Sequence, residues 1–420
     1  MAHTLAEKIL LAHSDADEIA VGDLIMVRCD IVMANDVSGP VAFRAMEEMG
    51  ASKVFDRDKV VMVADHFMPA KDAVSAGLQK RLKEWSLAQG VHFYDQGRGG
   101  IEHKIMIEDG FVLPGSVVVG GDSHTCTHGA LGAFGTGLGS TDIAAALAFG
   151  EFWQGVPGTI LVTIVGDKRR FVSGKDIILE VLAQIGVAGG TDKVLEFVGP
   201  GAEALSIDER LAVSNMAVEA GSETGIFPAD EKTAAYLEGR ARHAWEPVRS
   251  DPDAVFASKL TVDLDRLDPL IAMPHLPGNI QRVSDVTGKK IDQVYIGNCG
   301  NGTITDLRQA AEIFRGNHVH RDCRAIIVPA SQAVYREAMA EGLLEIFAEA
   351  GLVVSTPTCG ACFGGGNGAM AAGESALTTT NRNFKGRMGS GEAEVHLANA
   401  WVAAAAAVAG EIVNPAEVLA

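Results

Sequence analysis

The alternation of short apolar runs with longer amphipathic stretches most constrains the fold of this chain. The runs have the length of buried strands, and the stretches between them have the apolar spacing of helices that pack on a sheet. We predict strands at residues 25–27, 60–63, 116–119, 159–164, 293–296, 325–328 and 351–355, and helices at 41–49, 73–89, 141–153, 174–185 and 332–350. This order predicts an α/β fold with mostly parallel sheets.

The size of the chain predicts more than one packed unit. It has 420 residues, of which 47% are hydrophobic, enough to bury a substantial core. The alternation weakens between residues 240 and 289, where prolines precede a new strand. We therefore predict a division into residues 1–285 and residues 286–420, each built from α/β units.

Charge and cysteine usage exclude several classes of protein. The net charge of −19 argues against binding to nucleic acid, because a phosphate backbone attracts basic surfaces. Six cysteines are too few for a disulfide scaffold and indicate a reducing compartment. The start of the chain lacks the pattern of a secretory signal, and the longest apolar run is about half of the roughly 20 residues that a membrane span needs. We therefore predict a cytoplasmic protein with no membrane role.

Two glycine-rich turns after predicted strands carry cysteines. Cys359 and Cys362 lie three positions apart in CGAC, and Cys299 follows the strand at 293–296. Both turns are expected at strand carboxyl ends, the edge of an open α/β sheet where ligands bind. Three thiolates without a fourth suit an iron–sulfur cluster with one open iron. A redox pair, half of a zinc site and two inert turns are the alternatives.

Acidic residues stand beside histidines in two further segments. Asp65 directly precedes His66, and Asp122 lies two positions before His124. An aspartate beside a histidine can set its tautomer or share its proton, which suits acid–base chemistry near neutral pH. His103 lies near glycines and, taken singly, has no assigned role.

The histidine-rich run GDSHTCTHG also allows a different interpretation. If it formed a strand, His124, Cys126 and His128 would share one face and could bind zinc. A zinc hydrolase is therefore an alternative to an iron–sulfur protein.

A loop near the C-terminus contains two arginines five positions apart. The run is TNRNFKGR and includes Asn381, Arg382 and Arg387. Guanidinium groups bind carboxylates in a two-pronged manner, so the pair predicts a dicarboxylate clamp. A solvated basic loop is the alternative.

Taken together, the motifs form an ordered series. They are Asp65-His66, His103, GDSHTCTHG from Gly121, NMAVE ending at Glu219 with GIFPAD, Cys299, CGAC and NRNFKGR. From about residue 5 to residue 418 the chain resembles the large subunit of the 3-isopropylmalate dehydratase and homoaconitase branch of the aconitase family. The resemblance implies an aconitase-like α/β fold around a cluster-binding cleft.

The resemblance also implies roles for individual residues. A [4Fe–4S] cluster would be held by Cys299, Cys359 and Cys362. The acid–base and hydrogen-bonding set would be Asp65, His66, His103, Asp122, His124 and Glu219. Residues that orient the substrate and the cluster would be Asn381, Arg382 and Arg387, with Asn35, Asp36 and Ser123 as weaker matches. The acid–base set would lie in aconitase-like domains 1 and 2, within residues 1–285, and the cysteines and the arginine loop in domain 3, within residues 286–420.

The activity implied is that of a hydro-lyase that dehydrates or isomerises a substituted malate, a small dicarboxylate or tricarboxylate. We predict 3-isopropylmalate, in leucine biosynthesis, as the substrate. The alternatives are a 2,3-dimethylmalate dehydratase, a homoaconitase large subunit and a non-catalytic RNA-binding relative. The chain departs from the family pattern near Cys299, where Asn298, Gly300 and Thr303 replace a serine, a threonine and commonly an arginine.

The resemblance further implies a partner. In the family a serine on a swivelling fourth domain removes the substrate proton, and we expect that domain to be absent from this chain. A separate small subunit carrying the swivelling domain is therefore predicted, giving a heterodimer.

Overall fold

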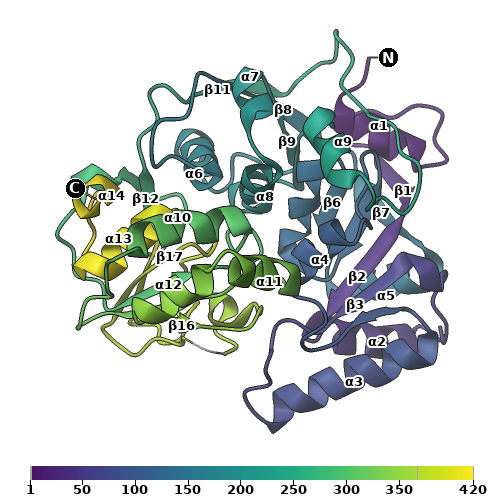
Figure 1. The fold of residues 1–420 in the computed structure, drawn as a ribbon. Helices are drawn as coiled ribbons and strands as arrows, with labels where there is room; N and C mark the ends of the chain where they lie inside the picture. The colour runs from purple at the N-terminus through teal and green to yellow at the C-terminus, as the bar shows by residue number, and fades with distance from the viewer. Residues whose placement is uncertain (1, 367, 420) are drawn as a thin grey trace.

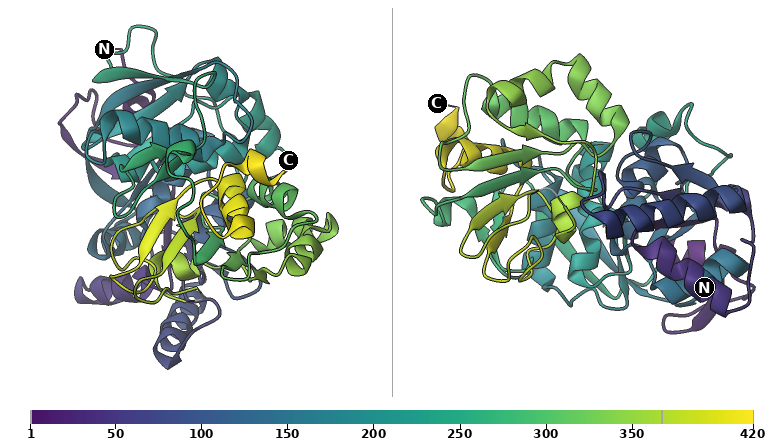
Figure 2. Two further views of the ribbon diagram at one scale, coloured as in Figure 1. Left: turned by 90° about the vertical axis from the view of Figure 1, so that its left-hand side faces the viewer. Right: turned by 90° about the horizontal axis from the view of Figure 1, so that it is seen from below.

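The computed structural model describes residues 2–366 and 368–419. Within these ranges the chain forms three sheets, which are wholly or mostly parallel, and one two-stranded ribbon (Figure 1). The purple-to-blue N-terminal part and the green-to-yellow C-terminal part lie side by side, and the teal middle part packs against both (Figures 1 and 2). The predicted α/β class is confirmed.

The first sheet is wholly parallel and begins the chain. Its order is β4 (His92–Tyr94), β3 (Val60–Val63), β2 (Ile31–Asn35), β5 (Val117–Gly120) and β6 (Phe134–Gly137). The helices of this part are α1 (Leu5–Ala12), α2 (Ser38–Glu48), η1 (Arg57–Lys59), α3 (Ala73–Gln89), α4 (Glu102–Glu108), η2 (Ser123–Leu131) and α5 (Ser140–Phe149). The three central strands, β2, β3 and β5, are fully buried runs because helices cover a parallel sheet on its faces, whereas the edge strand β4 is half-buried and β6 ends on the exposed Gly137.

The second sheet is also parallel, in the order β10 (Thr224–Ile226), β9 (Lys193–Val198), β8 (Gly158–Val165) and β11 (Ser258–Asp263). Its helices are α6 (Gly174–Ile185), α7 (Pro200–Ala204), α8 (Ile207–Asn215), η3 (Ala217–Ala220) and α9 (Glu231–Leu237). Helix α6 has the predicted bounds, and its Ser173 and Asp176 form a capping box at the N-terminus.

The third sheet is mixed. Its order is β13 (Ile280–Arg282), β12 (Leu270–Ala272), β18 (Glu394–Leu397), β17 (Ser375–Thr378), β14 (Gln293–Ile296), β15 (Arg324–Ile327) and β16 (Val353–Val354). The pairs that include β12 are antiparallel and the others are parallel. Its helices are η4 (Val283–Asp285), α10 (Ile304–Phe314), α11 (Gln332–Ala340), α12 (Leu343–Glu349), η5 (Gly360–Phe363), α13 (Ala400–Ala409) and α14 (Pro415–Val418).

Three predicted elements differ from the structure in pairing, end or continuity, while others are shifted by one to three residues at their ends. The strand predicted at 25–27 is β1 (Leu24–Arg28), which pairs antiparallel with β7 (Glu151–Gly155) in the ribbon and leaves Leu24 and Met26 exposed. The helix predicted at 141–153 ends at Phe149, because Gly150 adopts a left-handed conformation with φ +75°. The helix predicted at 332–350 is divided into α11 and α12 at Gly342, where φ is +72°.

The second and third sheets share one hydrophobic core. It extends from Ile160 and Phe197 in the second sheet to Tyr295 and Val395 in the third. Strands β12 and β13 join the third sheet although they precede residue 286, and the division at residues 285 and 286 stays our proposal. In the described ranges no helix is both long and apolar enough to cross a membrane.

Candidate active site

The carboxyl ends of parallel strands from two sheets carry most of the predicted site residues. In the first sheet, β2, β3 and β5 lead to Asn35, Asp65 and Asp122. In the third sheet, β14, β16 and β17 lead to Cys299, Cys359 and Asn381, as expected for a ligand-binding edge. The two edges meet where the Cys359 N–H donates to the carbonyl oxygen of Asp65 at 3.0 Å.

A close backbone contact fixes the first part of the chain against the third sheet. Gly100 forms a bridge with Ser331, and the Ile101 N–H donates to Ala330 O at 2.8 Å. A Cβ at Gly100 would lie 2.4 Å from the Ser331 Cα, so only glycine permits this approach. The contact places His103, at the start of α4, beside the strand ends.

Asp122 is the centre of the histidine cluster. Its Oδ1 lies 3.0 Å from His103 Nε2 and accepts from the His124 N–H at 2.7 Å, while its Oδ2 lies 3.7 Å from His66 Nε2. Burial alone would raise the pKa of Asp122, but the hydrogen bonds from the three histidines outweigh it and hold that pKa well below its usual range. Asp122 therefore stays a carboxylate that can orient and stabilise protonated imidazoles.

Asp65 and His66 form a hydrogen-bonded pair within the histidine cluster around Asp122. Asp65 Oδ1 lies 2.6 Å from His66 Nδ1, and the buried Asp36 accepts from the His66 N–H at 2.9 Å. Burial would lower the pKa of His66, but the charge of Asp65 and hydrogen bonds with Asp122 and Asp65 raise it well above 6.5. Asp36 is thus a further carboxylate beside the predicted pair of Asp65 and His66, and it shapes the turn after β3.

This shift predicts a dependence of stability on pH. Because the folded pKa of His66 is raised, its contribution is complete below the unfolded value of about 6.5 and is lost as pH rises through the folded pKa. We expect His66→Gln to reduce the free energy of unfolding of the cluster-free chain more at about pH 6 than at about pH 9. Urea unfolding at both pH values measures this, and a deficit that grew with pH would contradict the assignment.

Glu219 connects the histidine cluster to the arginine loop. Its Oε1 lies 3.2 Å from His124 Nε2 and accepts from Arg382 Nε at 2.7 Å. Burial would raise the pKa of Glu219, but these two partners lower it. Burial would lower the pKa of His124, but its hydrogen bonds with Asp122 and Glu219 raise that pKa. The structure therefore brings His124, Glu219 and Arg382 together as a series of contacting polar groups.

Glu102 is a site residue that sequence reasoning missed. It is fully buried, its Oε1 accepts from Asn35 Nδ2 at 2.8 Å, and its backbone N–H donates to Asp65 Oδ2 at 2.8 Å. Burial and the charges of Asp65 and Asp122 raise its pKa well above the usual range. Its position directly before His103 was the available signal.

Two predicted substrate-binding residues lie at the carboxyl ends of strands in the first sheet. Asn35 is buried, and its Oδ1 accepts from the N–H groups of Val37 and Ser38 at 2.9 Å, so it supports Glu102 and the start of α2. Ser123 begins η2 beside Asp122 and is half-buried. A direct contact of either side chain with substrate stays a prediction.

The three predicted cluster ligands lie together and are buried. The thiol of Cys359 donates to Cys362, which holds the pKa of Cys362 well below its usual range although burial opposes this. Burial and the negative charge of Cys362 raise the pKa of Cys299 well above the usual range. Each of the three sulfurs therefore shifts the pKa of the others. Three neighbouring thiolates repel one another unless a cation balances their charge.

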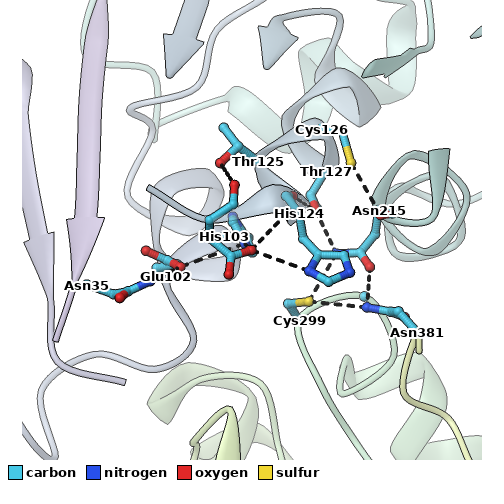
Figure 3. A network of polar contacts seen from close by, with 12 residues as sticks. Asn35, Glu102, His103, His124, Thr125, Cys126, Thr127, Asn215, Cys299 and Asn381 are labelled. Atoms are coloured by element: carbon cyan, nitrogen blue, oxygen red, sulfur yellow. Dashed lines mark hydrogen bonds and ion pairs between the residues drawn. The ribbon is translucent and has the colours of Figure 1, made fainter. Parts of the chain in front are cut away.

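The surroundings of these sulfurs fit a metal–sulfur cluster. Asn215 Nδ2 and Asn381 Nδ2 donate to Cys299 Sγ at 3.1 and 3.5 Å, and both amides converge on that sulfur (Figure 3). The Tyr295 hydroxyl, whose pKa is raised by burial and then by the three cysteines, has no hydrogen-bond partner among the described residues. Hydrogen-bond donors directed at ligand sulfurs are a feature of iron–sulfur sites.

Arg387 contacts the cysteine group at Cys362. Its guanidinium donates to Cys362, and its buried Nε is without a partner in the described ranges. Burial would lower the pKa of Arg387, but the charges of Cys362 and Cys359 raise it. A half-buried guanidinium with a free Nε donor beside the cysteines is suited to binding an anionic ligand.

The departures around Cys299 have structural explanations. Thr303 caps α10: its Oγ1 accepts from the Asp306 N–H and donates to Asp306 Oδ2 at 2.6 Å. Gly300 leaves room for Asn215, since a Cβ there would lie 2.9 Å from the Asn215 Cγ. Asn298 shapes the turn, accepting from the Gly300 N–H at 2.9 Å and donating to Asn381 Oδ1 at 2.9 Å.

The zinc hypothesis required His124, Cys126 and His128 to lie on one strand, and this prediction of a strand is wrong. Residues 123–131 form the 3₁₀ helix η2, in which alternate residues do not share a face. The Cys126 thiol donates to the Asn215 carbonyl oxygen at 3.2 Å, and both ring nitrogens of His128 lack partners within the described part of the chain. Burial and His103 lower the pKa of His128 well below its usual value.

Comparison with known proteins identifies the family of this chain. The model of the aconitase family (aconitate hydratase) matches residues 7–288 and 279–410. A 3-isopropylmalate dehydratase large subunit 2 of Rubrobacter xylanophilus is 71% identical over 418 residues, covering 100% of this chain and 99% of the relative. The 3-isopropylmalate dehydratase large subunits of Desulfitobacterium hafniense and Nitratidesulfovibrio vulgaris are 51% and 50% identical, each covering at least 99% of both chains. The chain belongs to the aconitase family.

Proposed function

We propose that this chain is the large subunit of a 3-isopropylmalate dehydratase, a hydro-lyase of leucine biosynthesis in the cytoplasm. The observation that carries the proposal is the meeting of three buried cysteines with a histidine–carboxylate cluster at the edges of two sheets. The full-length relatives at 48–71% identity support the substrate. The departures at residues 298–303 support an unchanged reaction, because their contacts are with the protein itself.

In this proposal Cys299, Cys359 and Cys362 hold a [4Fe–4S] cluster. When bound, such a cluster supplies an iron without a protein thiolate, which acts as a Lewis acid toward the hydroxyl and a carboxylate of the substrate. The chain contributes the sulfur ligands and the amide donors of Asn215 and Asn381. All three cysteines are buried.

The histidine cluster would manage the protons of the dehydration. The departing hydroxide needs a proton, and His103 and His124 are the imidazoles held directly by Asp122. Asp65 and Glu219 would keep His66 and His124 oriented and protonated. We propose these six residues as the acid–base set.

Arg382 and Arg387 would bind the carboxylates of the substrate. We expect Arg387→Lys to reduce kcat/KM by about 10²-fold while leaving iron content near that of the wild type, because lysine keeps the charge but cannot form a two-pronged contact. Steady-state kinetics with iron analysis measure this. Lys385→Arg, in the same loop, is the control and should leave both unchanged. Unaltered kinetics in Arg387→Lys would exclude a carboxylate contact.

The term large subunit in the names of the relatives supports a small subunit as partner. We propose that it carries the swivelling domain and the base that removes the proton from carbon. Closure of that domain over the two sheet edges would exclude water from the reacting groups.

The experiment that tests the function is an anaerobic dehydration assay that follows absorbance of the unsaturated product. The reconstituted chain is assayed with 3-isopropylmalate and with 2,3-dimethylmalate, before and after addition of the small subunit. We expect turnover only after addition, with the higher kcat/KM for 3-isopropylmalate. A preference for 2,3-dimethylmalate would contradict the assigned substrate, and full turnover by the chain alone would contradict the need for a partner.

A further inference from the structure

A buried lysine lies behind the Cys299 ligand turn. Lys175, in the first turn of α6, is fully buried. Its Nζ donates to Thr380 O at 3.0 Å and to Asn381 Oδ1 at 3.2 Å, and it lies 3.1 Å from Met216 Sδ. No carboxylate forms a salt bridge with it in the described ranges, although buried ammonium groups usually have one. Its contacts therefore need an explanation other than an ion pair.

The contact with Asn381 determines which way that amide faces. An ammonium group only donates, so the Asn381 atom beside Lys175 must be the oxygen. Asn298 Nδ2 donates to the same oxygen at 2.9 Å. With its oxygen held by two donors, Asn381 directs its NH₂ group at Cys299 Sγ and at Asn215 Oδ1.

The orientation of the Asn381 amide determines that of the Asn215 amide. Asn215 Oδ1 accepts from Asn381 Nδ2 at 2.5 Å, so its own NH₂ group faces Thr127 Oγ1 at 2.6 Å and Cys299 Sγ at 3.1 Å. The Thr127 hydroxyl donates to His124 O and can therefore accept from Asn215. The two amides and Cys299 form one connected network (Figure 3).

We propose that Lys175 is a positioning residue, which fixes the Asn381 amide and through it the Asn215 amide so that both present N–H groups to the Cys299 sulfur. The inference rests on the proposed function, since the sulfur would be a cluster ligand. N–H donors stabilise the more negative, reduced state of a cluster. Loss of the lysine would therefore make the cluster harder to reduce.

The test is the midpoint potential of the reconstituted full chain, measured by redox titration with spectroscopic detection. Lys175→Met has a similar length without the donors, and we expect a midpoint potential more negative than that of the wild type. Lys104→Met is the matched control: Lys104 is also buried, but donates to Asp208, so its removal should lower stability and leave the potential unchanged.

A double-variant cycle separates positioning from a direct effect of charge. If Lys175 acts through Asn381, Lys175→Met should cause no further shift in an Asn381→Leu background. A wild-type potential in Lys175→Met, or the same shift in both backgrounds, would overturn the inference and leave the proposed function intact. A wild-type chain that assembled no cluster would contradict the proposed function and this inference together.

Discussion

Replacement of Cys299, Cys359 or Cys362 by serine is expected to abolish both cluster retention and activity. All three sulfurs lie in one buried group at the edge of the third sheet, and each would be one of the three thiolates available to the cluster. A serine hydroxyl is a poor substitute because iron–sulfur clusters are held by thiolates. Iron, acid-labile sulfide and visible absorbance after anaerobic reconstitution measure the loss.

The other cysteines provide the controls. Burial raises the pKa of Cys29 and of Cys126 to about 12 and that of Cys323 to about 11, so each is a neutral thiol at neutral pH. Cys126 is the most demanding control, since its thiol donates to the carbonyl oxygen of Asn215, the residue whose side-chain amide donates to Cys299 Sγ. Cluster loss in Cys126→Ser with retention in Cys299→Ser would overturn the ligand assignment.

Asp122→Asn is expected to lower kcat/KM by about 10²- to 10⁴-fold with little change in iron content. The substitution removes the carboxylate that contacts His103, His124 and His66. The pKa values of His66 and His124, which Asp122 helps to raise, should then fall, and with them the fraction of protonated acid at neutral pH. Kinetics across a range of pH measure both effects.

Asp30→Asn is a matched control for this variant. Asp30 also holds a histidine, with its Oδ2 2.8 Å from His13 Nε2, but it precedes β2 at the opposite edge of the first sheet. The control should lose some stability and keep wild-type kinetics. Equal losses of activity in the two variants would show that Asp122 has a structural role only.

The fold was predictable where apolar runs and helix signals agree. Strands β3 and β14 and helices α3 and α6 have the predicted bounds, because their buried faces and flanking residues define them locally. The ribbon could not be predicted in the same way. The run at 25–27 has the composition of a buried strand, and only pairing with residues 151–155 shows that one of its faces is exposed.

The candidate site was predictable to the extent that its residues lie in recognisable runs. The cysteines, the Asp–His pairs and the arginine loop were found, and the structure brings them together at the strand ends. Lys175 could not be assigned from the sequence, and the signal for Glu102 was limited to its position directly before His103. Lys175 occurs in an ordinary amphipathic helix, and its contacts with Thr380 and Asn381 come from a segment about 200 residues away. Such contacts are set by tertiary packing alone.

The metal and sulfide content of the anaerobically purified and reconstituted chain tests the central claim most directly. The claim is that three cysteine thiolates from two turns hold a four-iron cluster beside a histidine–carboxylate cluster. The account predicts about four iron and about four acid-labile sulfide per chain, with zinc absent. Zinc alone, or iron without sulfide, would contradict it.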